Sequence, residues 1–403
     1  MQYIFLVFTL FLLFIEFVWY NVLKSAFPSF DWLLLTVVLF NVVFFSIIFF
    51  LVYLVVKAQE SIKKWKYILR LSTLTTIVLF PKLFIIVLSS LEKIISFFTT
   101  IIFNQPPYNQ ENIYKIIILL GLVPIIAFLH GYFFGRYNFK VINKTVYFKN
   151  LPKQFEGFKV LQISDIHTGS LSNVKKISKG IDLINKQNAD LIVFTGDLIN
   201  HDIQEAEPWV EVFAKIKRAK FGNYSVLGNH DYGNKFSKIL KKELEEIIKN
   251  HIIIQQKMGF KLLVNKVEVI NKSNQKINLI GVENYGAPPF PQFGDLIKAT
   301  EGIGNDEFNI LLTHDPSHFD LEVKTFQKTI PLTLSGHTHG MQFGIEFMGF
   351  KWSPVKYKYP KWAGLYKENN KYLYVNRGFG YIGIPARIGI WPEITVLTLK
   401  KEN

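Results

Sequence analysis

Six short motifs in the C-terminal part of the chain carry side chains that proteins use to hold metal ions. They are Ser164-Asp165-Ile166-His167, Gly196-Asp197, Gly228-Asn229-His230-Asp231, Thr313-His314-Asp315-Pro316, Gly336-His337-Thr338-His339 and Asn376-Arg377-Gly378. The first five motifs contain five of the nine histidines in the chain, each within two positions of a glycine or a carboxylate. This concentration of imidazole and carboxylate groups predicts a metal-dependent hydrolase.

The spacing inside two of these motifs suits metal binding. Asp165 and His167 are two positions apart. In an extended chain such side chains point to the same side, so both can reach one ion. His337 and His339 repeat the spacing, and they serve either one ion or two.

The other motifs supply the remaining candidate ligands. Asp197 is a single carboxylate that follows a glycine, and a carboxylate is able to bridge two cations. Asn229 and His314 bring the set to seven ligands, or about four protein contacts per ion with one bridge, which leaves room for a hydroxide and a phosphate. His230 is interpreted as an acid–base group, and Asp231 as the carboxylate that orients its imidazole.

Cysteine is absent from the chain, so thiolate ligands, disulfides and a cysteine nucleophile are excluded. Mixed imidazole, carboxylate and amide ligands suit manganese, iron, zinc or cobalt. The cofactor that we expect is therefore a pair of divalent ions drawn from these metals.

Apolar runs typical of strands precede most of the motifs. They are Val160–Ile163, Leu191–Phe194, Tyr224–Leu227, Ile277–Ile280, Ile310–Leu312, Tyr372–Val375 and Ile394–Leu397, with the shorter Pro331–Leu334 before the Gly336 motif. Apolar residues at helical spacing predict helices over Val174–Gln187 and Phe236–Lys249. Alternating strands and helices predict a layered α/β fold, and the late strands without clear helices predict a partly mixed sheet. In such sheets functional loops gather beyond the carboxyl ends of strands.

The N-terminal third has the pattern of a membrane domain. Four mostly apolar stretches have the length of about 20 residues that crosses a bilayer, and they are Tyr3–Val22, Trp32–Val56, Leu71–Ser90 and Ile116–Phe134. Ile94–Phe103 is too short to cross alone, and we expect it to extend the third span or to lie at the interface. A change in composition near Arg136–Tyr147 divides the chain into a transmembrane helical domain, 1–140, and a catalytic domain, 147–403.

The charges of the loops predict an orientation. Basic residues cluster between the second and third spans and after the fourth, at Lys57, Lys63, Lys64, Lys66, Arg70, Arg136, Lys140, Lys144 and Lys149. Positively charged loops stay in the cytoplasm, so four spans place the catalytic domain on the cytoplasmic side of the cytoplasmic membrane. The net charge of +15 fits nucleic acid or an anionic membrane as a partner. No arginine-rich arm or nucleic-acid motif is present in the sequence, which favours the membrane.

Three ionisable residues lie inside or beside the apolar spans, namely Glu16, Lys82 and His130. Intramembrane charges are functional candidates in general. For Glu16 and Lys82 the alternative is that they snorkel or pair between helices, and we favour this structural role.

The motif series resembles the calcineurin-like metallophosphoesterase superfamily over about Val160 to Leu399. The ending resembles that of bacterial membrane-anchored phosphohydrolases with an N-terminal bundle of spans, through Gly364-Leu365-Tyr366, Tyr374-Val375-Asn376-Arg377-Gly378-Phe379-Gly380, Pro385-Ala386-Arg387 and Pro392-Glu393-Ile394. The resemblance implies a double β-sandwich flanked by helices. In this family Gly-His-Thr-His is often followed by Gly-Gly-Gln, whereas here it is followed by Gly340-Met341-Gln342, a change that removes no ligand.

The resemblance also implies how the ligands divide between two ions. One ion would be held by Asp165, His167, Asp197 and His339, and the other by Asp197, Asn229, His314 and His337, with Asp197 bridging. His230 would stabilise the transition state and protonate the leaving group. Arg377 and Arg387 are candidates for contact with the substrate phosphate, because arginine binds phosphate in a bidentate manner; the alternative is a structural role in the closing strands.

The segment from Gln342 to Tyr366 is rich in aromatic residues and lysines, a mixture that is typical of the membrane–water interface. It predicts a lipid-linked phosphate or pyrophosphate substrate, and related phosphohydrolases include ones that cleave UDP-2,3-diacylglucosamine. Alternatively, the aromatic residues pack within a long loop. The other functions that we consider are a tethered phosphodiesterase for soluble nucleotides and a non-catalytic membrane sensor that keeps the fold.

Overall fold

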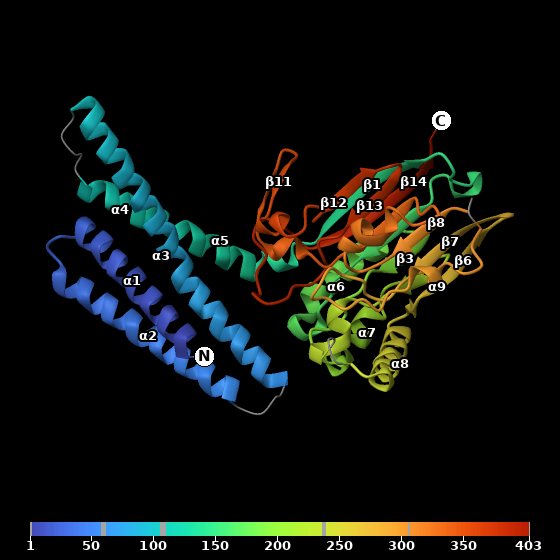
Figure 1. The fold of residues 1–403 in the computed structure, drawn as a ribbon, viewed down its shortest axis with the longest axis horizontal. Helices are drawn as coiled ribbons and strands as arrows, with labels where there is room; N and C mark the ends of the chain where they lie inside the picture. The colour runs from blue at the N-terminus through green and yellow to red at the C-terminus, as the bar shows by residue number, and fades with distance from the viewer. Residues whose placement is uncertain (1, 58–61, 105–109, 236–238, 305–306, 403) are drawn as a thin grey trace. The chain divides into compact units, whose positions relative to one another are not determined.

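The computed structural model describes residues 2–57, 62–104, 110–235, 239–304 and 307–402. These residues form two compact units, Met1–His130 and Gly131–Asn403. The first unit is helical, and the second contains all the β-strands that the structure describes (Figure 1). The second unit begins before the expected start at residue 147, because residues 140–148 form a strand of its sheet rather than a linker.

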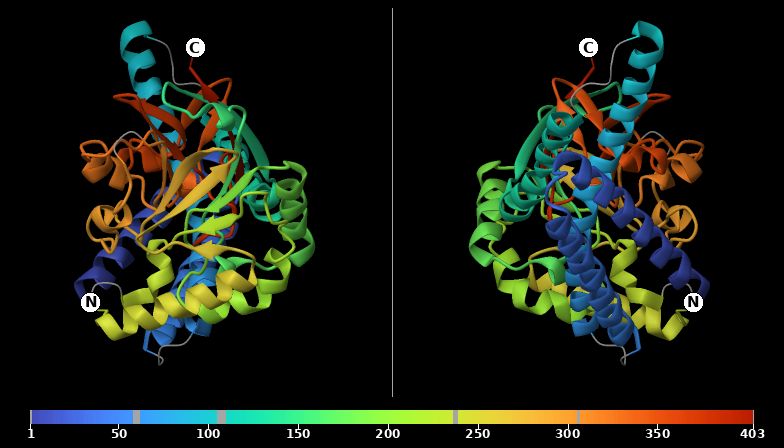
Figure 2. Two further views of the ribbon diagram at one scale, coloured as in Figure 1. Left: turned by 90° about the vertical axis from the view of Figure 1, so that its right-hand side faces the viewer. Right: turned by 90° about the vertical axis from the view of Figure 1, so that its left-hand side faces the viewer.

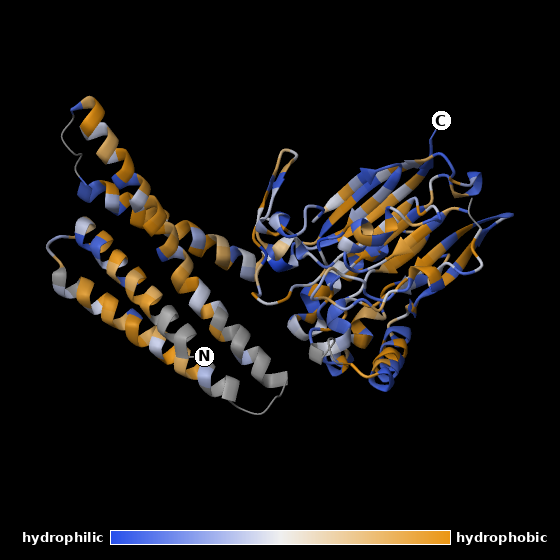
Figure 3. Ribbon diagram, viewed as in Figure 1, coloured by the Kyte–Doolittle hydropathy of each residue, from blue (hydrophilic) through white to orange (hydrophobic). Residues whose placement is uncertain are grey.

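The N-terminal unit is built from apolar helices (Figure 3). Their bounds are α1 Gln2–Ala26, α2 Asp31–Lys57, α3 Ile62–Phe103, α4 Gln110–Leu120 and α5 Leu122–Phe133, the last of which runs into the second unit. Three stretches among the described residues are long and apolar enough to cross a membrane, and they are Leu34–Leu51, Thr73–Phe103 and Gln110–Tyr137. They correspond to the second, third and fourth predicted spans. α1 covers the first predicted span, whose crossing of the membrane stays a prediction.

The ambiguous segment after Ser90 is helical. α3 continues without a break from Ile62 to Phe103, with Pro81 inside it. Ile94–Phe103 is therefore an extension of the third helix, one of the two expected arrangements.

Glu16 on α1 and Lys82 on α3 form an ion pair between two helices. Both side chains are buried, and the Lys82 Nζ also lies 5.4 Å from the centre of the Phe45 ring on α2. The pair joins α1 to α3, and Lys82 also contacts α2, so the expected pairing between helices is confirmed. His130 lies near the end of α5 with an exposed side chain.

We expect the Lys82→Met variant to lower the stability of the helical unit by about 3 kcal/mol, because it leaves the buried Glu16 without its counter-charge. The thermal midpoint of the purified full-length chain in detergent measures this loss. The matched control is Lys115→Met, which breaks an exposed pair with Glu111 and is expected to change stability by less than about 0.5 kcal/mol. Equal midpoints for Lys82→Met and Lys115→Met would refute the assigned role.

The C-terminal unit consists of two six-stranded sheets and a small hairpin. The first sheet has the order β1-β14-β2-β3-β4-β5, with bounds β1 Lys140–Phe148, β14 Glu393–Lys401, β2 Lys159–Ile163, β3 Leu191–Phe194, β4 Asn223–Ser225 and β5 Lys261–Leu262. The second has the order β12-β13-β9-β8-β7-β6, with bounds β12 Gly364–Glu368, β13 Lys371–Val375, β9 Leu332–Ser335, β8 Asn309–Leu312, β7 Gln275–Gly281 and β6 Lys266–Lys272. The hairpin joins β10 Ile345–Phe347 to β11 Phe350–Trp352.

Parallel pairing at the centre of each sheet gathers the loops that carry the motifs. β2, β3 and β4 run parallel, as do β7, β8, β9 and β13. The edges are mixed, because β14 pairs antiparallel with β2, while β12 and β6 pair antiparallel with their neighbours. The predicted mixed α/β architecture is confirmed, and the seven predicted strands all form.

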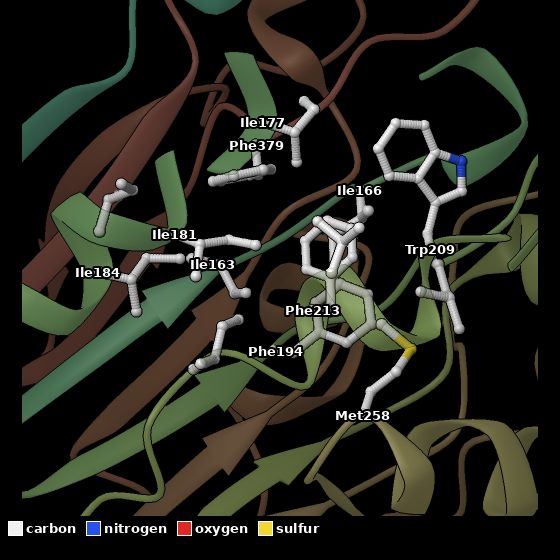
Figure 4. Packing of buried hydrophobic residues seen from close by; sticks show 14 of the residues in the cluster. Ile163, Ile166, Ile177, Ile181, Ile184, Phe194, Trp209, Phe213, Met258 and Phe379 are labelled. Atoms are coloured by element: carbon white, nitrogen blue, oxygen red, sulfur yellow. The ribbon is translucent and has the colours of Figure 1, made fainter. Parts of the chain in front are cut away.

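The apolar faces of the two sheets enclose one core, and helices cover the outer faces (Figure 2). Fully buried residues of both sheets meet in this central core, among them Val160, Val193, Leu279, Ile310 and Leu334. On the outer face of the first sheet, Ile177 and Ile181 of α6 Val174–Lys186 pack close to Ile163 and Phe194, together with Phe213 of α7 Val210–Phe213 (Figure 4). The short helix α9 Leu296–Ala299 covers the second sheet.

The second predicted helix lies further along the chain than expected. α8 runs over Lys241–Lys257, whereas the expected range was Phe236–Lys249, of which 236–238 lies outside the described residues. His251 and Gln255 lie beyond the expected end of the helix, and both are buried. The helix therefore continues through residues that pack against the rest of the C-terminal unit.

Candidate metal centre

Five strand ends from both sheets meet at the predicted ligands. In the first sheet, Asp165 and His167 follow β2, Asp197 follows β3, and Asn229 follows β4. The second sheet supplies the remaining three ligands, with His314 after β8 and with His337 and His339 after β9. The carboxyl ends of these parallel strands point to one edge of the sandwich, and this common direction brings together residues up to 174 positions apart.

One group of three possible ligands consists of Asp165, His167 and His339, whose ligand atoms all lie within 4.8 Å of one another. His167 Nε2 is 3.0 Å from His339 Nε2, and His339 Nε2 is 3.2 Å from Asp165 Oδ1. All three residues are buried. This spacing brings together two imidazole nitrogens and a carboxylate oxygen, a donor set that divalent ions accept.

A second group joins Asp197, His314 and His337 within the same 4.8 Å limit. His314 Nε2 is 3.2 Å from Asp197 Oδ2, and His337 Nδ1 is 3.3 Å from His314 Nε2. Asn229 also contributes an oxygen here, since its Oδ1 lies 2.7 Å from His337 Nδ1. The amide of Asn229 therefore completes this second donor set.

Asp197 lies between the two groups. Its Oδ2 is 3.2 Å from His314 Nε2 in the second group and 3.5 Å from His167 Nε2 in the first. Its Oδ1 accepts a hydrogen bond of 2.9 Å from the backbone N–H of His230. The carboxylate is thus held in the one position from which it reaches both groups.

Most of the candidate ligands have an unusual backbone conformation. Asp165, His167, Asp197, His337 and His339 all have positive φ, between 50° and 72°. Residues other than glycine seldom adopt this region, and each instance costs on the order of 1–3 kcal/mol. Because the five lie together, the surrounding structure must stabilise these tight turns at the strand ends, where they direct side chains into one site.

The glycines before the ligands make room for this convergence. A Cβ at Gly336 would lie 1.9 Å from Ser164 Oγ and 2.3 Å from Asp165 Oδ2. A Cβ at Gly228 would lie 2.2 Å from Asp197 Oδ1. Any side chain at either position would push a candidate ligand away. This steric conflict explains why glycine precedes the ligand in the Gly-His and Gly-Asn motifs.

The buried charges of the site compensate one another. Burial by itself would raise the pKa of Asp165 and of Asp197, but the neighbouring histidines His339 and His314 hold both pKa values below their usual range. Burial would lower the pKa of His314, yet the Asp197 carboxylate outweighs it and raises that pKa to about 10. Ionised carboxylates in a buried site require positive charge. A divalent ion supplies that charge through the same oxygen atoms, so the residues fit metal ions.

Hydrogen bonds behind the site orient the imidazoles. His167 Nδ1 lies 3.1 Å from the carbonyl oxygen of Ile199, and His314 Nδ1 lies 2.7 Å from that of Thr195. A carbonyl accepts, so each Nδ1 carries a proton, and each Nε2 is the ring nitrogen that faces the site and would bind an ion.

Tyr359 and Asp315 orient His337 through its Nε2, whereas His167 and His314 are oriented through Nδ1. His337 Nε2 lies 2.8 Å from the hydroxyl of Tyr359, which in turn lies 3.4 Å from Asp315 Oδ2. Burial raises the pKa of the Tyr359 phenol well above its usual value, so the hydroxyl stays protonated and donates to Asp315. The contact with Tyr359 holds the His337 ring so that its Nδ1 faces the second group. The sequence carries no local signal for this role, since Tyr359 lies in the aromatic segment that predicts lipid contact.

We expect Tyr359→Phe to lower metal affinity or turnover by roughly 10–100-fold, because His337 loses the hydrogen bond that orients its ring. Metal titration of the purified protein, with turnover measured beside it, tests this expectation. The control is Tyr357→Phe in the same segment, where the side chain is 77% exposed. An effect of the same size in both variants would contradict the positioning role.

Asp231 does not orient His230, so that prediction is wrong. The Asp231 carboxylate accepts hydrogen bonds from the backbone N–H groups of Asp197, Leu198 and Gly228 at 2.8–2.9 Å. These bonds stabilise the turn that carries Asp197, and Asp231 is buried beneath it. A buried carboxylate satisfies its lone pairs with the nearest donors, which here are amides.

His230 is instead oriented by a carbonyl. Its Nδ1 lies 2.9 Å from the backbone oxygen of Asn200, and its ring centre is 5.1 Å from that of His167. With Nδ1 directed at Asn200, Nε2 is the ring nitrogen left to exchange a proton.

The predicted substrate contact is wrong for Arg387. Its side chain is fully buried, and it donates to the carbonyl oxygens of Arg377 at 2.8 Å and Gly380 at 2.7 Å. Its Nη2 is also 3.3 Å from His339 Nδ1. Arg387 therefore holds the closing loops behind His339, in agreement with the structural alternative.

Arg377 is likewise occupied by protein groups. Its guanidinium makes a bidentate ion pair with Glu346 on β10, and its Nε is 3.2 Å from Glu393 Oε2. The side chain is 7% exposed. Glu346 thus engages both Nη atoms, in agreement with the structural alternative, and a contact of Arg377 with the substrate phosphate stays a prediction.

The segment from Gln342 to Tyr366 combines buried and exposed aromatic residues. Tyr359 and Trp362 are buried, and they belong to a small core with Ile390. Phe347, Phe350 and Tyr357 are more than 60% exposed. The alternative that aromatic residues pack within the loop is confirmed for Tyr359 and Trp362, whereas lipid contact by the exposed residues stays a prediction.

Comparison with known proteins agrees with this geometry. The family model for calcineurin-like phosphoesterases matches residues 158–341. The uncharacterized metallophosphoesterase YkuE of Bacillus subtilis is 31% identical over 281 residues, which cover 68% of this chain and 91% of that protein. A transmembrane protein with metallophosphoesterase domain from Danio rerio is 29% identical over 65% of this chain and 57% of its own length.

A metallophosphoesterase of Helicobacter pylori strain J99 is 27% identical, and the match covers 68% of each chain. The double sandwich, the two groups of ligands and the match to nearly the whole of the Bacillus protein agree with one another. The chain therefore belongs to the calcineurin-like metallophosphoesterases, a family of metal-dependent phosphoester hydrolases.

Proposed function

We propose that the C-terminal unit holds two divalent ions and hydrolyses a phosphoester or pyrophosphate bond. Asp165, His167 and His339 hold the first ion, and His314, His337 and Asn229 hold the second. The observation that carries the proposal is the position of the Asp197 carboxylate, with one oxygen 3.5 Å from His167 and 3.2 Å from His314. Such a carboxylate is a bridge between two adjacent metal sites.

Bound divalent ions supply Lewis acidity and a water nucleophile that ionises near neutral pH. The protein residues would hold the ions at fixed positions, because Asp197 lies between the two groups and the backbone turns fix the imidazoles. The mixed oxygen and nitrogen donors suit manganese, iron, zinc or cobalt.

His230 is the proton donor of the proposed reaction. It lies next to His167, is half-buried, and has Nδ1 anchored to the oxygen of Asn200 at 2.9 Å. That anchor directs Nε2 away from the backbone, where it protonates the departing oxygen of the substrate. Its ring bonds to the Asn200 carbonyl rather than to a candidate ligand, so we propose that the role of His230 is separable from metal binding.

The substrate that we propose is lipid-linked, with a phosphate or pyrophosphate such as that of UDP-2,3-diacylglucosamine. Two observations support it. The chain carries stretches that are long and apolar enough to cross a membrane. The segment that supplies Tyr359 to the site also presents exposed Phe347 and Phe350. An amphiphilic substrate would contact both the membrane and these exposed rings.

Three assays separate this proposal from its competitors. The purified full-length chain in detergent with Mn²⁺ is offered a soluble nucleotide diester, a phosphomonoester and a lipid pyrophosphate. Preferred turnover of the lipid pyrophosphate supports the proposal, whereas preference for the soluble diester identifies a tethered phosphodiesterase. Absence of turnover on all three, with both ions bound, would indicate a sensor that keeps the fold.

We further propose that the catalytic unit faces the cytoplasm from the cytoplasmic membrane. The basic loops support this orientation, with Lys57 and Arg70 bounding one cluster and Arg136 beginning the other. A pair of reporters fused after Asn403, one active only in the cytoplasm and one only outside it, tests the orientation. Activity of the external reporter alone would refute it.

A further inference from the structure

The β10–β11 hairpin has two charged side chains that bond to other residues of the C-terminal unit. In its register Glu346 lies opposite Lys351. Glu346 pairs with Arg377, and Lys351 contacts the carbonyl oxygen of Ala363 and the hydroxyl of Tyr366. Charges thus attach this hairpin to the sheet unit.

The opposite face of the hairpin is apolar and exposed. Ile345 lies opposite Trp352, and Phe347 lies opposite Phe350 in the same ladder. Because side chains alternate along a strand, these four residues lie on the face of the hairpin opposite Glu346 and Lys351. Ile345, Phe347 and Phe350 are 56%, 69% and 63% exposed, and Met348 in the turn is 90% exposed.

This arrangement reverses the usual one, in which a two-stranded element buries its apolar face and exposes its charges. Figure 1 shows the hairpin, labelled β11, projecting from the body of the C-terminal unit. A contiguous apolar patch at the tip of a projecting element indicates a binding surface. The pattern therefore requires a partner that is itself apolar.

The residues that follow the hairpin indicate which partner this is. Lys356, Tyr357 and Lys358 are consecutive and exposed. Lysine heads and aromatic rings beside an apolar patch suit an anionic lipid surface, where rings lie at headgroup level and cations meet phosphates. The chain also carries apolar stretches long enough to cross a bilayer, so the hairpin remains tethered to a lipid surface at high effective concentration.

We propose that the β10–β11 hairpin inserts Phe347, Met348 and Phe350 into the bilayer that anchors the chain. The hairpin then docks the catalytic unit on the lipid surface by a second contact, separate from the membrane helices. Glu346 connects this contact to Arg377, which is next to Gly378, and a Cβ on Gly378 would lie 3.1 Å from His339 Nδ1. Docking through the hairpin thus fixes the metal centre near the lipid headgroups.

The absence of cysteine from the sequence allows a direct test. The Met348→Cys variant of the full-length chain is labelled with an environment-sensitive fluorophore. It is reconstituted in nanodiscs of phosphatidylcholine and phosphatidylglycerol, in which some of the lipid carries a nitroxide on its acyl chain. The matched control is Asn369→Cys, at the turn between β12 and β13, where φ is 48° compared with 47° at Met348.

We expect the nitroxide lipid to quench the label at position 348 several-fold more strongly than the label at position 369. Aqueous iodide should show the reverse order. Adding Phe347→Ser and Phe350→Ser to the Met348→Cys chain should reduce the lipid quenching to the level of the control, because the anchoring side chains are gone. This readout needs no turnover, so it fails or succeeds independently of the proposed function.

Two results would overturn the proposal. Equal quenching by iodide at positions 348 and 369, without quenching by the nitroxide lipid, would show a hairpin that stays in water. Protection from both quenchers at position 348 would show that protein covers the tip, either a second copy or another part of the chain.

Discussion

Replacing Asp197 with alanine is expected to lower turnover by at least about a thousandfold and to reduce the bound metal. Among the residues that the structure describes, Asp197 is the carboxylate with an oxygen within 3.5 Å of ligand nitrogens in both groups, so under the proposed function its loss would remove a ligand from each ion at once. Substitution of groups that only orient metal ligands already costs roughly 10–100-fold, and a shared ligand must cost more. Steady-state kinetics with elemental analysis of the same sample measures both consequences.

The control for this variant is Asp182→Ala on α6, which removes an exposed carboxylate from the same unit. Its turnover and metal content should equal those of the unaltered chain. The substitution removes the carboxylate that contacts the His314 imidazole. Circular dichroism of Asp197→Ala therefore checks that the fold survives. Two ions per chain together with more than about a tenth of the original turnover would refute the bridging role.

Replacing His230 with alanine should lower kcat by about 100- to 10,000-fold while both ions stay bound. The ring anchors its Nδ1 to the Asn200 oxygen, and only its backbone N–H contacts Asp197, so the substitution leaves the donor sets intact. KM should change little, because a proton donor acts on the departing oxygen rather than on substrate binding. Kinetics and metal analysis of one preparation test this separation.

A comparison of leaving groups makes the test of His230 more specific. A substrate with an acidic leaving group, such as p-nitrophenol, needs little protonation and should lose less rate than one with an alkyl leaving group. Added imidazole should restore part of the activity toward the alkyl substrate. An equal loss with both substrates, or loss of metal from the variant, would contradict the role of proton donor.

Several parts of the molecule were predictable because their signals are local. The apolar stretches of the N-terminal third and the seven strand-like runs are decided by composition over short windows, and the structure has helices or strands at each. The seven ligand candidates follow strand ends, and parallel strands bring such ends to one edge. Pairing between helices was one of the two structural roles expected for Glu16 and Lys82, and the structure shows this pair.

The residues behind the site were not predictable in the same way. Asp231 is next to His230 in the sequence, yet its carboxylate bonds to amides of the loop after β3. Arg387 suits phosphate by type but is surrounded by carbonyl oxygens. The partner of a buried polar group is whichever complementary atom the packing brings near, and this depends on distant segments.

The pairing of ligands shows where sequence reasoning ends. Two-residue spacing predicts a shared side in extended chain, and Asp165 and His167 do share one group. His337 and His339 have the same spacing but fall in different groups. All four have positive φ, so the chain is not extended there and the alternation rule does not apply.

The sequence by itself determined which side chains are available, which strands carry them and that the chemistry is metal-dependent phosphoester hydrolysis. Only the tertiary structure decided how they combine. Each group of ligands takes members from both sheets, with Asp165 and His167 from the first meeting His339 from the second. The physical reason is that the sites exist only where the two sheets pack face to face, and that packing results from the buried core they share rather than from any single motif.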